Sequence, residues 1–371
     1  MKFTVSTSDL QRILSKLAGV IPSKSTMPIL ETLLFELVNN ILNVTATDLV
    51  VSSTIGIDVS GSEDGIVAIP AKRLLDTMRS LPDTSVTFVI DPTTSKIRIT
   101  TPTGEYALTG EAAKEYPQIP PFKGSSEFVI ESSAIKKLVY RTSFAVSTDE
   151  LRPAMMGILL QTNGTEIRAV ATDGHRLSRA SYRTDLPARL SKDVIIPSKA
   201  MGILAKALES GTCTVSIIDT HARFAYDHSV LTSRIIEEAY PNYESVIPQD
   251  NTKLATVNRD QAIASIRRVS LYASATTHQI KVELDTNSLK LSAQDVDFGG
   301  EATETLPCEY DGEKMEIGFN AIYLADILAH LDTDRVILKF STSTRAGIIV
   351  PAEELQHEST VMLIMPVRLN T

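Results

Sequence analysis

The sequence predicts an α+β protein built from three copies of one unit, each with two helices packed on antiparallel strands. A short motif ending in aspartate recurs about once per domain length, at Asp48, Asp173 and Asp295. A strand followed by a helix is predicted on each side of every motif, and alternating strands fill the intervals. A chain of 371 residues has room for two or three domains.

The aspartate motif sets the length of the repeat. Its copies are NVTATDLVVSSTI (43–55), RAVATDGHRLSRA (168–180) and LKLSAQDVDFGGE (289–301). Stretches rich in proline and polar residues follow EYPQIPPF and AYPNYESVIP, as domain boundaries often do. We therefore expect domains at 1–121, 122–249 and 250–371.

The first helix of each repeat follows a short strand. The segments are MKFTVSTSDLQRILSKLAG, SEFVIESSAIKKLVYRTS and KLATVNRDQAIASIRRVS. Apolar residues from Leu10 to Leu17 recur at the i, i+3, i+4, i+7 spacing of an amphipathic helix. Ser8 and Asn258 are each followed three residues later by glutamine, which predicts capping boxes at both positions.

The second helix of each repeat also follows a strand, in segments 67–81, 194–208 and 315–331. Alternating strands such as SVTFVI, KIRIT, TVSII and RVILKF come next. Strands outnumber helices and connect as hairpins, so the sheets should be mostly antiparallel. Helices gathered on one face give the α+β class.

Positive charge is concentrated in the predicted helices. Five of the six windows carry a net charge of +1 to +3, and the window 320–331 contains only Asp326. The six windows together carry +9, and the whole chain carries −9, so the remainder carries −18. A basic helical face on an acidic body can attract a phosphate backbone. The alternative is that these residues are merely good helix formers on a solvated face.

The helix count bears on whether one chain could encircle DNA. Six helices spaced about 10 Å apart would enclose a hole of only about 9 Å, whereas twelve would enclose about 28 Å. A DNA duplex is roughly 20 Å across. Two chains joined head to tail by their sheet edges would therefore form a ring wide enough for a DNA duplex, with helices lining the hole.

Other sequence features exclude several classes of protein. Cys213 and Cys308 lack metal-ligand spacing, so they suggest buried thiols in a reducing compartment. No signal peptide or membrane-spanning run is present, and we expect a cytoplasmic protein without a cofactor. No helix-turn-helix, zinc finger or aromatic RNA-binding signature is present, which favours phosphate contacts without sequence specificity.

Several segments resemble the bacterial DNA polymerase III beta subunit family, the sliding clamps. They are MKFTV, MPILETLLF (27–35), ATDL (46–49), VATDGHRL (170–177), YPNYESVIP (240–248), MEIGFNAIYL (315–324) and MPVRL (365–369). The resemblance covers the whole chain. It implies a homodimeric ring of six similar domains that encircles duplex DNA and has no catalytic site or metal. The implied partners are DNA polymerase III alpha, other polymerases, the clamp loader complex, and mismatch-repair and ligase proteins, with no membrane.

The resemblance also implies three sets of site residues. Partner peptides would dock in a pocket formed by Ile158, Thr172, Gly174, His175, Arg176, Leu177, Pro241, Val246, Leu363, Met365, Pro366, Val367, Arg368 and Leu369. DNA would contact Lys24, Arg73, Arg79, Lys136, Lys137, Arg141, Lys199, Lys206, Arg267 and Arg268. The dimer interface would include Tyr106 and Leu271. Glu244, Ser245 and the Asn370–Thr371 extension depart from the family pattern near the pocket.

Two other hypotheses compete with the clamp. One is an enzyme that uses Asp173 and His175, which would face the same side of a strand. No nucleophile motif, phosphate loop or metal spacing accompanies them, and Asp48 and Asp295 occupy equivalent places without a histidine. The other hypothesis is a repetitive scaffold with no role on DNA.

Overall fold

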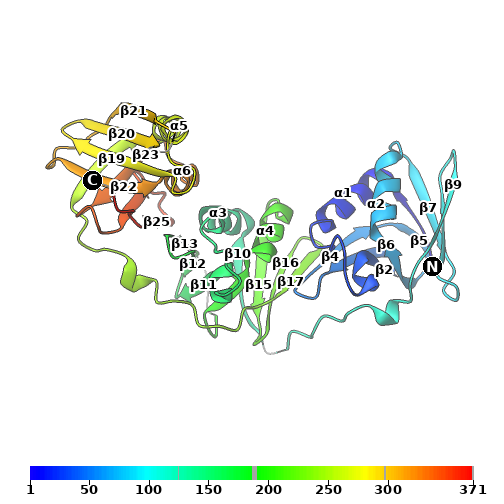
Figure 1. Ribbon diagram of the computed structural model, residues 1–371. Helices are drawn as coiled ribbons and strands as arrows, with labels where there is room; N and C mark the ends of the chain where they lie inside the picture. Colours follow the sequence, from blue (N-terminus) through cyan, green and yellow to red (C-terminus); the bar gives the residue numbers. More distant parts are fainter. Residues whose placement is uncertain (124, 186–189, 296–297, 370–371) are drawn as a thin grey trace. The chain divides into compact units, whose positions relative to one another are not determined.

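The computed structural model describes residues 1–123, 125–185, 190–295 and 298–369 (Figure 1). The described strands form four antiparallel sheets, and each of the three repeats contains two α-helices. The three-repeat α+β prediction is therefore confirmed. The six helices lie within the strand-plus-helix segments expected from the sequence.

The elements of the first repeat extend from β1 to the 3₁₀ turn η2. They are β1 (Lys2–Ser6), α1 (Thr7–Leu17), η1 (Pro28–Glu31), β2 (Thr32–Val38), β3 (Ile41–Thr47), β4 (Val51–Asp58), β5 (Ser60–Glu63), β6 (Gly65–Pro70), α2 (Ala71–Ser80), β7 (Ser85–Ile90), β8 (Lys96–Thr100), β9 (Glu105–Thr109) and η2 (Ala113–Glu115).

The second repeat follows the same order without a counterpart of β5. Its elements are β10 (Ser126–Glu131), α3 (Ser132–Ser143), η3 (Pro153–Met156), β11 (Gly157–Asn163), β12 (Glu166–Thr172), β13 (Arg176–Arg183), β14 (Val194–Pro197), α4 (Ser198–Ala207), β15 (Thr212–Ile217), β16 (His221–Tyr226), β17 (Ser229–Arg234) and η4 (Glu244–Val246).

The third repeat completes the chain. Its elements are β18 (Lys253–Asn258), α5 (Arg259–Ser270), β19 (Gln279–Asp285), β20 (Ser288–Asp295), β21 (Gly300–Pro307), β22 (Met315–Asn320), α6 (Ala321–Ala329), β23 (Arg335–Phe340), β24 (Gly347–Pro351) and β25 (Glu358–Ile364). Helices α5 and α6 lie side by side, and α5 packs on β20 and β21 (Figure 1).

One of the two predicted helix caps is confirmed and one is wrong. The Asn258 side chain accepts a hydrogen bond from the backbone N–H of Gln261 at 2.9 Å, which caps α5. At α1 the cap is Ser6, whose hydroxyl accepts from the Asp9 N–H at 3.1 Å. The helix begins at Thr7, before Ser8, because the buried Thr7 side chain anchors it to the Pro82 carbonyl.

Strands of consecutive repeats share sheets. One sheet has the order β10-β15-β16-β17-β4-β3-β2-β6, and another has the order β14-β11-β12-β13-β25-β24-β23-β18. We call the pairs β4–β17 and β13–β25 the first and second repeat junctions. The middle repeat gives half of its strands to each of these sheets. The chain accordingly forms two compact units, 1–133 with 199–235, and 134–198 with 236–371.

The remaining two sheets contain strands of a single repeat each. Their orders are β5-β1-β7-β8-β9 in the first repeat and β21-β20-β19-β22 in the third. Isolated bridges extend four sheet edges: Glu111 pairs with β6, Ile236 with β14, Glu309 with β18 and Val367 with β22. No such bridge is found at the other four edges, β5, β9, β10 and β21, among the described residues. No described helix is long and apolar enough to cross a membrane.

Three phenylalanines anchor the core of the first repeat. The Phe3 and Phe88 rings stack with their centroids 4.8 Å apart, and Phe35 packs 6.3 Å from Phe88. All three side chains are buried. Aromatic rings bury large apolar areas and gain further from stacking, so this cluster should contribute strongly to stability.

We expect Phe88→Ala to lower the free energy of unfolding by about 3–5 kcal/mol, because it leaves a cavity between Phe3 and Phe35. Urea denaturation followed by circular dichroism measures this loss. The neighbouring Val89 points to solvent and is 41% exposed. Val89→Ala should therefore cost about 1 kcal/mol or less, and equal losses for the two variants would contradict the packing described.

Candidate functional site

A tight turn between β12 and β13 lies at the second junction. The Asp173 carboxylate accepts hydrogen bonds from the backbone N–H groups of His175 and Arg176, at 2.8 and 2.9 Å. The Thr172 hydroxyl donates to the Arg176 carbonyl at 2.7 Å and accepts from the Gly174 N–H at 3.1 Å. Gly174 has φ of +91°, which glycine adopts without steric cost.

The equivalent aspartates accept hydrogen bonds of the same kind. Asp48 accepts from the N–H groups of Val50 and Val51 at 3.0 and 2.7 Å. Asp295 accepts from the Phe298 N–H at 3.2 Å. In all three copies the aspartate accepts a hydrogen bond from the backbone N–H of the residue three positions later. The aspartate is therefore a structural element of the repeat, as the sequence indicated.

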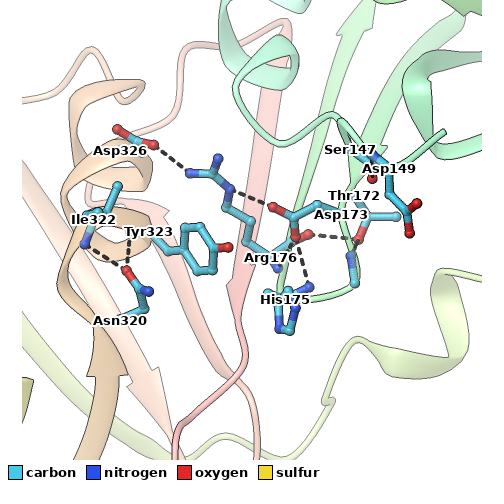
Figure 2. Close-up of polar contacts among 11 residues, drawn as sticks. Ser147, Asp149, Thr172, Asp173, His175, Arg176, Asn320, Ile322, Tyr323 and Asp326 are labelled. Carbon is cyan, nitrogen blue, oxygen red and sulfur yellow. Dashed lines mark hydrogen bonds and ion pairs between the residues drawn. The ribbon is translucent and has the colours of Figure 1, made fainter. Parts of the chain in front are cut away.

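Arg176 is the residue that distinguishes the middle turn. Figure 2 shows its guanidinium between Asp173 of the turn and Asp326 on α6, with N–O distances of 3.1 and 2.6 Å. Its Cζ lies 4.6 Å from the ring centroid of Tyr323 and 5.2 Å from that of Phe144. The side chain is only 11% exposed, so these contacts replace most of its hydration.

A cavity of about 270 Å³ lies beside this turn. Its lining comes from η3, the turn, β13, the segment before and within η4, and the end of β25: Arg152, Met155, Thr172, Gly174, Arg176, Leu177, Pro241, Asn242, Tyr243, Val246, Leu363 and Met365. Leu177 and Leu363 are buried, whereas Val246 and Met365 are 51% and 42% exposed at the mouth. A cavity with an apolar base and a few polar groups suits an apolar side chain of a ligand.

The paired strands β13 and β25 supply two of the apolar groups. Leu177 and Leu363 are direct cross-strand partners. The corresponding partners at the first junction are Ser52 and Thr232. The two junctions therefore share their backbone pairing but differ in the polarity of this position.

The structure places eight of the fourteen predicted pocket residues in the cavity lining: Thr172, Gly174, Arg176, Leu177, Pro241, Val246, Leu363 and Met365. Ile158 is fully buried on the opposite face of β11 from Leu159, which packs in the core beneath the cavity. His175 accepts the Met365 N–H through its carbonyl, and its ring stacks on Tyr323.

The chain after Met365 leaves the cavity. The Val367 N–H donates to the Gly318 carbonyl at 2.9 Å, so Pro366, Val367, Arg368 and Leu369 continue beside β22 rather than around the cavity. The Asn370–Thr371 extension lies outside the described residues. Leu369 lies next to Gly318, where an added Cβ would meet its side chain.

Four further residues that the sequence did not predict also line the cavity: Arg152, Met155, Asn242 and Tyr243. The last two stand between Pro241 and Val246, so their position in the chain could have indicated them. The Tyr243 hydroxyl donates to Gln161 at 2.6 Å and accepts from Arg168 at 3.2 Å. Burial raises the pKa of Tyr243, and the hydroxyl remains a neutral donor. Glu244, noted as a departure from the family pattern, pairs with Arg168 at 2.9 Å.

Most predicted DNA contacts are exposed side chains. Lys24, Arg73, Arg79, Lys136, Lys199, Lys206, Arg267 and Arg268 are exposed. Lys199 pairs with Asp48, and Arg268 pairs with Glu304 at 2.6 Å. The Arg268 hydrogen bonds lower the pKa of Glu304 to about 2, so this pair stays ionised at neutral pH.

Arg141 is a correction to the predicted DNA face. Its side chain is 10% exposed, and its guanidinium pairs with Asp332 and Glu358 at 2.8 Å each. Lys137 is half-buried and pairs with the same Glu358 at 2.6 Å. Helix α3 therefore uses both cations for packing within its unit, because a buried carboxylate requires charged partners. Arg141 cannot offer its charge to a phosphate in this arrangement.

Of the two predicted interface residues, Tyr106 lies on an unextended sheet edge and Leu271 lies beside a residue that contacts another such edge. Tyr106 is on β9 and is 38% exposed. Leu271 follows α5 and is 81% exposed. The neighbouring Tyr272 lies against Gly300, the first residue of β21. Exposed apolar residues beside open strand edges favour association.

The turn lacks the geometry of an Asp–His catalytic pair. Asp173 bonds to the backbone N–H of His175, whereas the imidazole ring lies against Tyr323 (Figure 2). Within the described ranges, no three His, Cys, Asp or Glu side chains gather closely enough to hold a metal ion.

Comparison with solved structures defines the class of protein. The DNA polymerase sliding clamp of Pseudomonas aeruginosa superposes with a TM-score of 0.93 at 30% identity, covering all of both chains. The clamp of Bacillus subtilis gives 0.94 at 26% identity, again over both whole chains. The three repeats therefore have the fold of a sliding clamp.

Sequence comparison gives the family. Three family models match in order, described as the N-terminal, central and C-terminal domains of the DNA polymerase III beta subunit, over residues 1–120, 129–242 and 244–368. The beta sliding clamps of Pseudomonas aeruginosa and Vibrio cholerae are 30% and 29% identical, over the full length of each chain. The chain belongs to the bacterial DNA polymerase III beta subunit family, the beta sliding clamps. It is thus a processivity factor, and the enzyme hypothesis is wrong.

Proposed function

We propose that two copies of the chain close head to tail into a ring that encircles duplex DNA without sequence specificity. The ring tethers polymerases and other DNA-processing proteins through the cavity at the second junction. The observation that carries the proposal is that β9 and β21, two of the four unextended sheet edges, are the strands whose counterparts pair with each other at both junctions within the chain.

The topology of the repeats supports this pairing. In element order, β9 corresponds to β17 and β25, whereas β21 corresponds to β4 and β13. Strands of these two kinds pair at both junctions within the chain, as β4–β17 and β13–β25. A third junction of the same kind requires β21 of one copy and β9 of another. Each such junction would pair two strand edges that are exposed in the single chain.

Charge at the turns supports the same arrangement. At the first junction, Asp48 of the turn pairs with Lys199 near the start of α4. Asp295 has the place of Asp48 in the third repeat, and Lys72 has the place of Lys199 near the start of α2. We therefore propose that Asp295 of one copy pairs with Lys72 of the other. A cleft of about 1240 Å³ beside α2 reaches Tyr106 and can receive apolar side chains such as Leu271.

The proposed DNA contacts are the exposed cations of the helical face. Lys24, Arg73, Arg79, Lys206 and Arg267 are the strongest candidates, because they are exposed and form no ion pair with an acidic residue in the part of the chain that the structure describes. Lys136 is a further candidate as an exposed side chain of α3. Phosphate contacts of this kind position a duplex without reading its bases. The net charge of −9 then limits binding to the face where the cations gather.

The proposed partner site is the cavity beside Arg176. An apolar base formed by Leu177 and Leu363 and a mouth formed by Val246 and Met365 can hold the apolar anchor of a short peptide. The flexible Met155 and Met365 side chains allow several ligands to fit. We propose as partners DNA polymerase III alpha, other polymerases, the clamp loader, and mismatch-repair and ligase proteins. We also propose domain boundaries at 1–121, 122–249 and 250–371, and a cytoplasmic location.

A topological experiment tests the ring. With a clamp loader present, the protein should remain on circular nicked DNA and be lost when one cut linearises that DNA, because a ring slides off free ends. Gel filtration of labelled protein with the DNA measures retention. Equal retention on circular and linear DNA would indicate ordinary surface binding and contradict encirclement.

A charge exchange tests the proposed dimer contact. Lys72→Glu and Asp295→Lys should each raise the dimer dissociation constant in sedimentation equilibrium, by roughly tenfold, because like charges then face each other. The double variant should recover most of the affinity. Lys199→Glu is the matched control, since its partner Asp48 lies in the same chain. Single variants that dimerise as tightly as the unmodified protein would rule out the contact.

Truncation tests the partner site. Removal of residues 365–371 should abolish binding of a polymerase-derived C-terminal peptide, measured by fluorescence anisotropy, while dimerisation survives. Met365 lines the cavity, and its N–H bond to His175 holds the end of β25 in place. Removal of residues 370–371 alone is the control and should leave affinity unchanged. Peptide affinity that survives the longer truncation would disprove the site.

A further inference from the structure

We propose that Asp326 on α6 is a positioning residue for the docking cavity, and that it acts through Arg176. The inference rests on the proposed function of that cavity. Asp326 itself is not among the cavity-lining residues, whereas Arg176 is. Its role would therefore be to fix the orientation of a guanidinium that forms part of the wall.

The contacts of Arg176 assign separate tasks to its two acidic partners. Asp173 uses one carboxylate oxygen for the turn N–H groups and offers the other to Nε of Arg176 at 3.1 Å. The outer nitrogen Nη1 bonds to Asp326 at 2.6 Å. Tyr323 and Phe144 contact the guanidinium through their rings. Asp326 is thus the group that fixes the far end of the side chain (Figure 2).

Burial makes this contact consequential. The Arg176 side chain is 11% exposed, and a guanidinium removed from water to that extent needs charged or hydrogen-bonding partners. Without Asp326, Nη1 would need a hydrogen bond to water or to another acceptor, and the Arg176 side chain could turn away from Tyr323. Such a movement would reshape the wall next to Leu177, because Arg176 and Leu177 are consecutive residues of β13.

The two junctions show that this arrangement is specific to the second. At the first junction the helix supplies the cation, Lys199, and the turn supplies the acid, Asp48. At the second junction the turn supplies the cation, Arg176, and the helix supplies the acid. Ile322 stands on α6 where Lys199 stands on α4. Asp326 is also the only charged residue of that helical window. The positions of the cation and the acid are therefore exchanged between turn and helix, relative to the first junction.

Peptide titrations of the full-length protein test the proposal. Asp326→Asn keeps the shape of the side chain and removes its charge. We expect it to weaken binding of the polymerase-derived C-terminal peptide about three- to tenfold, as for one charge-assisted hydrogen bond that is partly exposed. Asp326→Glu should restore affinity to within about twofold of the unmodified protein. Affinity unchanged by Asp326→Asn would overturn the proposal.

A double-mutant cycle separates positioning from a general structural effect. In an Arg176→Ala background, Asp326→Asn should have no further effect on peptide affinity, because the residue through which it acts is gone. An equal loss in both backgrounds would show that Asp326 acts by another route, and would overturn the positioning role. If Asp326→Asn fails to fold by circular dichroism, Asp326→Ser replaces it with the same expected and contrary results.

Asp332 provides a matched control in the same unit. It is 46% exposed, compared with 42% for Asp326, and it pairs with the equally buried Arg141. Arg141 does not line the cavity, so Asp332→Asn should leave peptide affinity unchanged. A comparable loss for Asp332→Asn would assign the effect to unit stability and refute the inference. Failure of the unmodified protein to bind the peptide would instead refute the proposed function of the cavity.

Discussion

Backbone pairing between strands of consecutive repeats is the constraint on which the rest of this structure depends. Each repeat leaves a strand edge with unpaired N–H and C=O groups, which are costly to leave without partners. The edges meet as β4 with β17 and as β13 with β25, always antiparallel. This pairing fixes which side chains oppose one another at a junction. It also leaves β9 and β21, the counterparts of these junction strands, without a partner of that kind in the described chain, and a second copy would supply one in the proposed ring.

A repeated backbone allows one junction to acquire a function without altering the others. The aspartate turn has the same hydrogen bonds in the first and second repeats, so the pairing of the following strand is unchanged. Ser52 and Thr232 are cross-strand partners at the first junction, and Leu177 and Leu363 are the corresponding partners at the second, where they make this part of the sheet apolar. The GHR sequence then adds a cation next to it. The proposed docking function of the second junction would therefore be carried by side chains, on a backbone pairing that both junctions share.

The sequence predicted the parts of this structure that depend on local pattern. The recurrence of Asp48, Asp173 and Asp295 and the apolar spacing in each helix were sufficient for three repeats and six helices. Strand partners between repeats lie far apart in the chain, so hydrophobic alternation alone does not specify them. The same limit explains Arg141 and Ile158. A charge count cannot show that a helical arginine meets Glu358, and an apolar strand residue can face either side of its sheet.

The acidic character of α6 follows from the chemistry of the turn that it faces. A turn carrying Asp alone is best matched by a cationic helix, and α4 supplies Lys199 to Asp48. Once the turn carries Arg176 at a largely buried position, a lysine on the facing helix would place two cations together in a poorly hydrated contact. A carboxylate there completes the coordination of the guanidinium instead. The one helical window with negative charge is thus the expected counterpart of the one turn with an arginine. Positive charge in five helical windows and the proposed docking cavity beside the sixth can therefore coexist in a single chain.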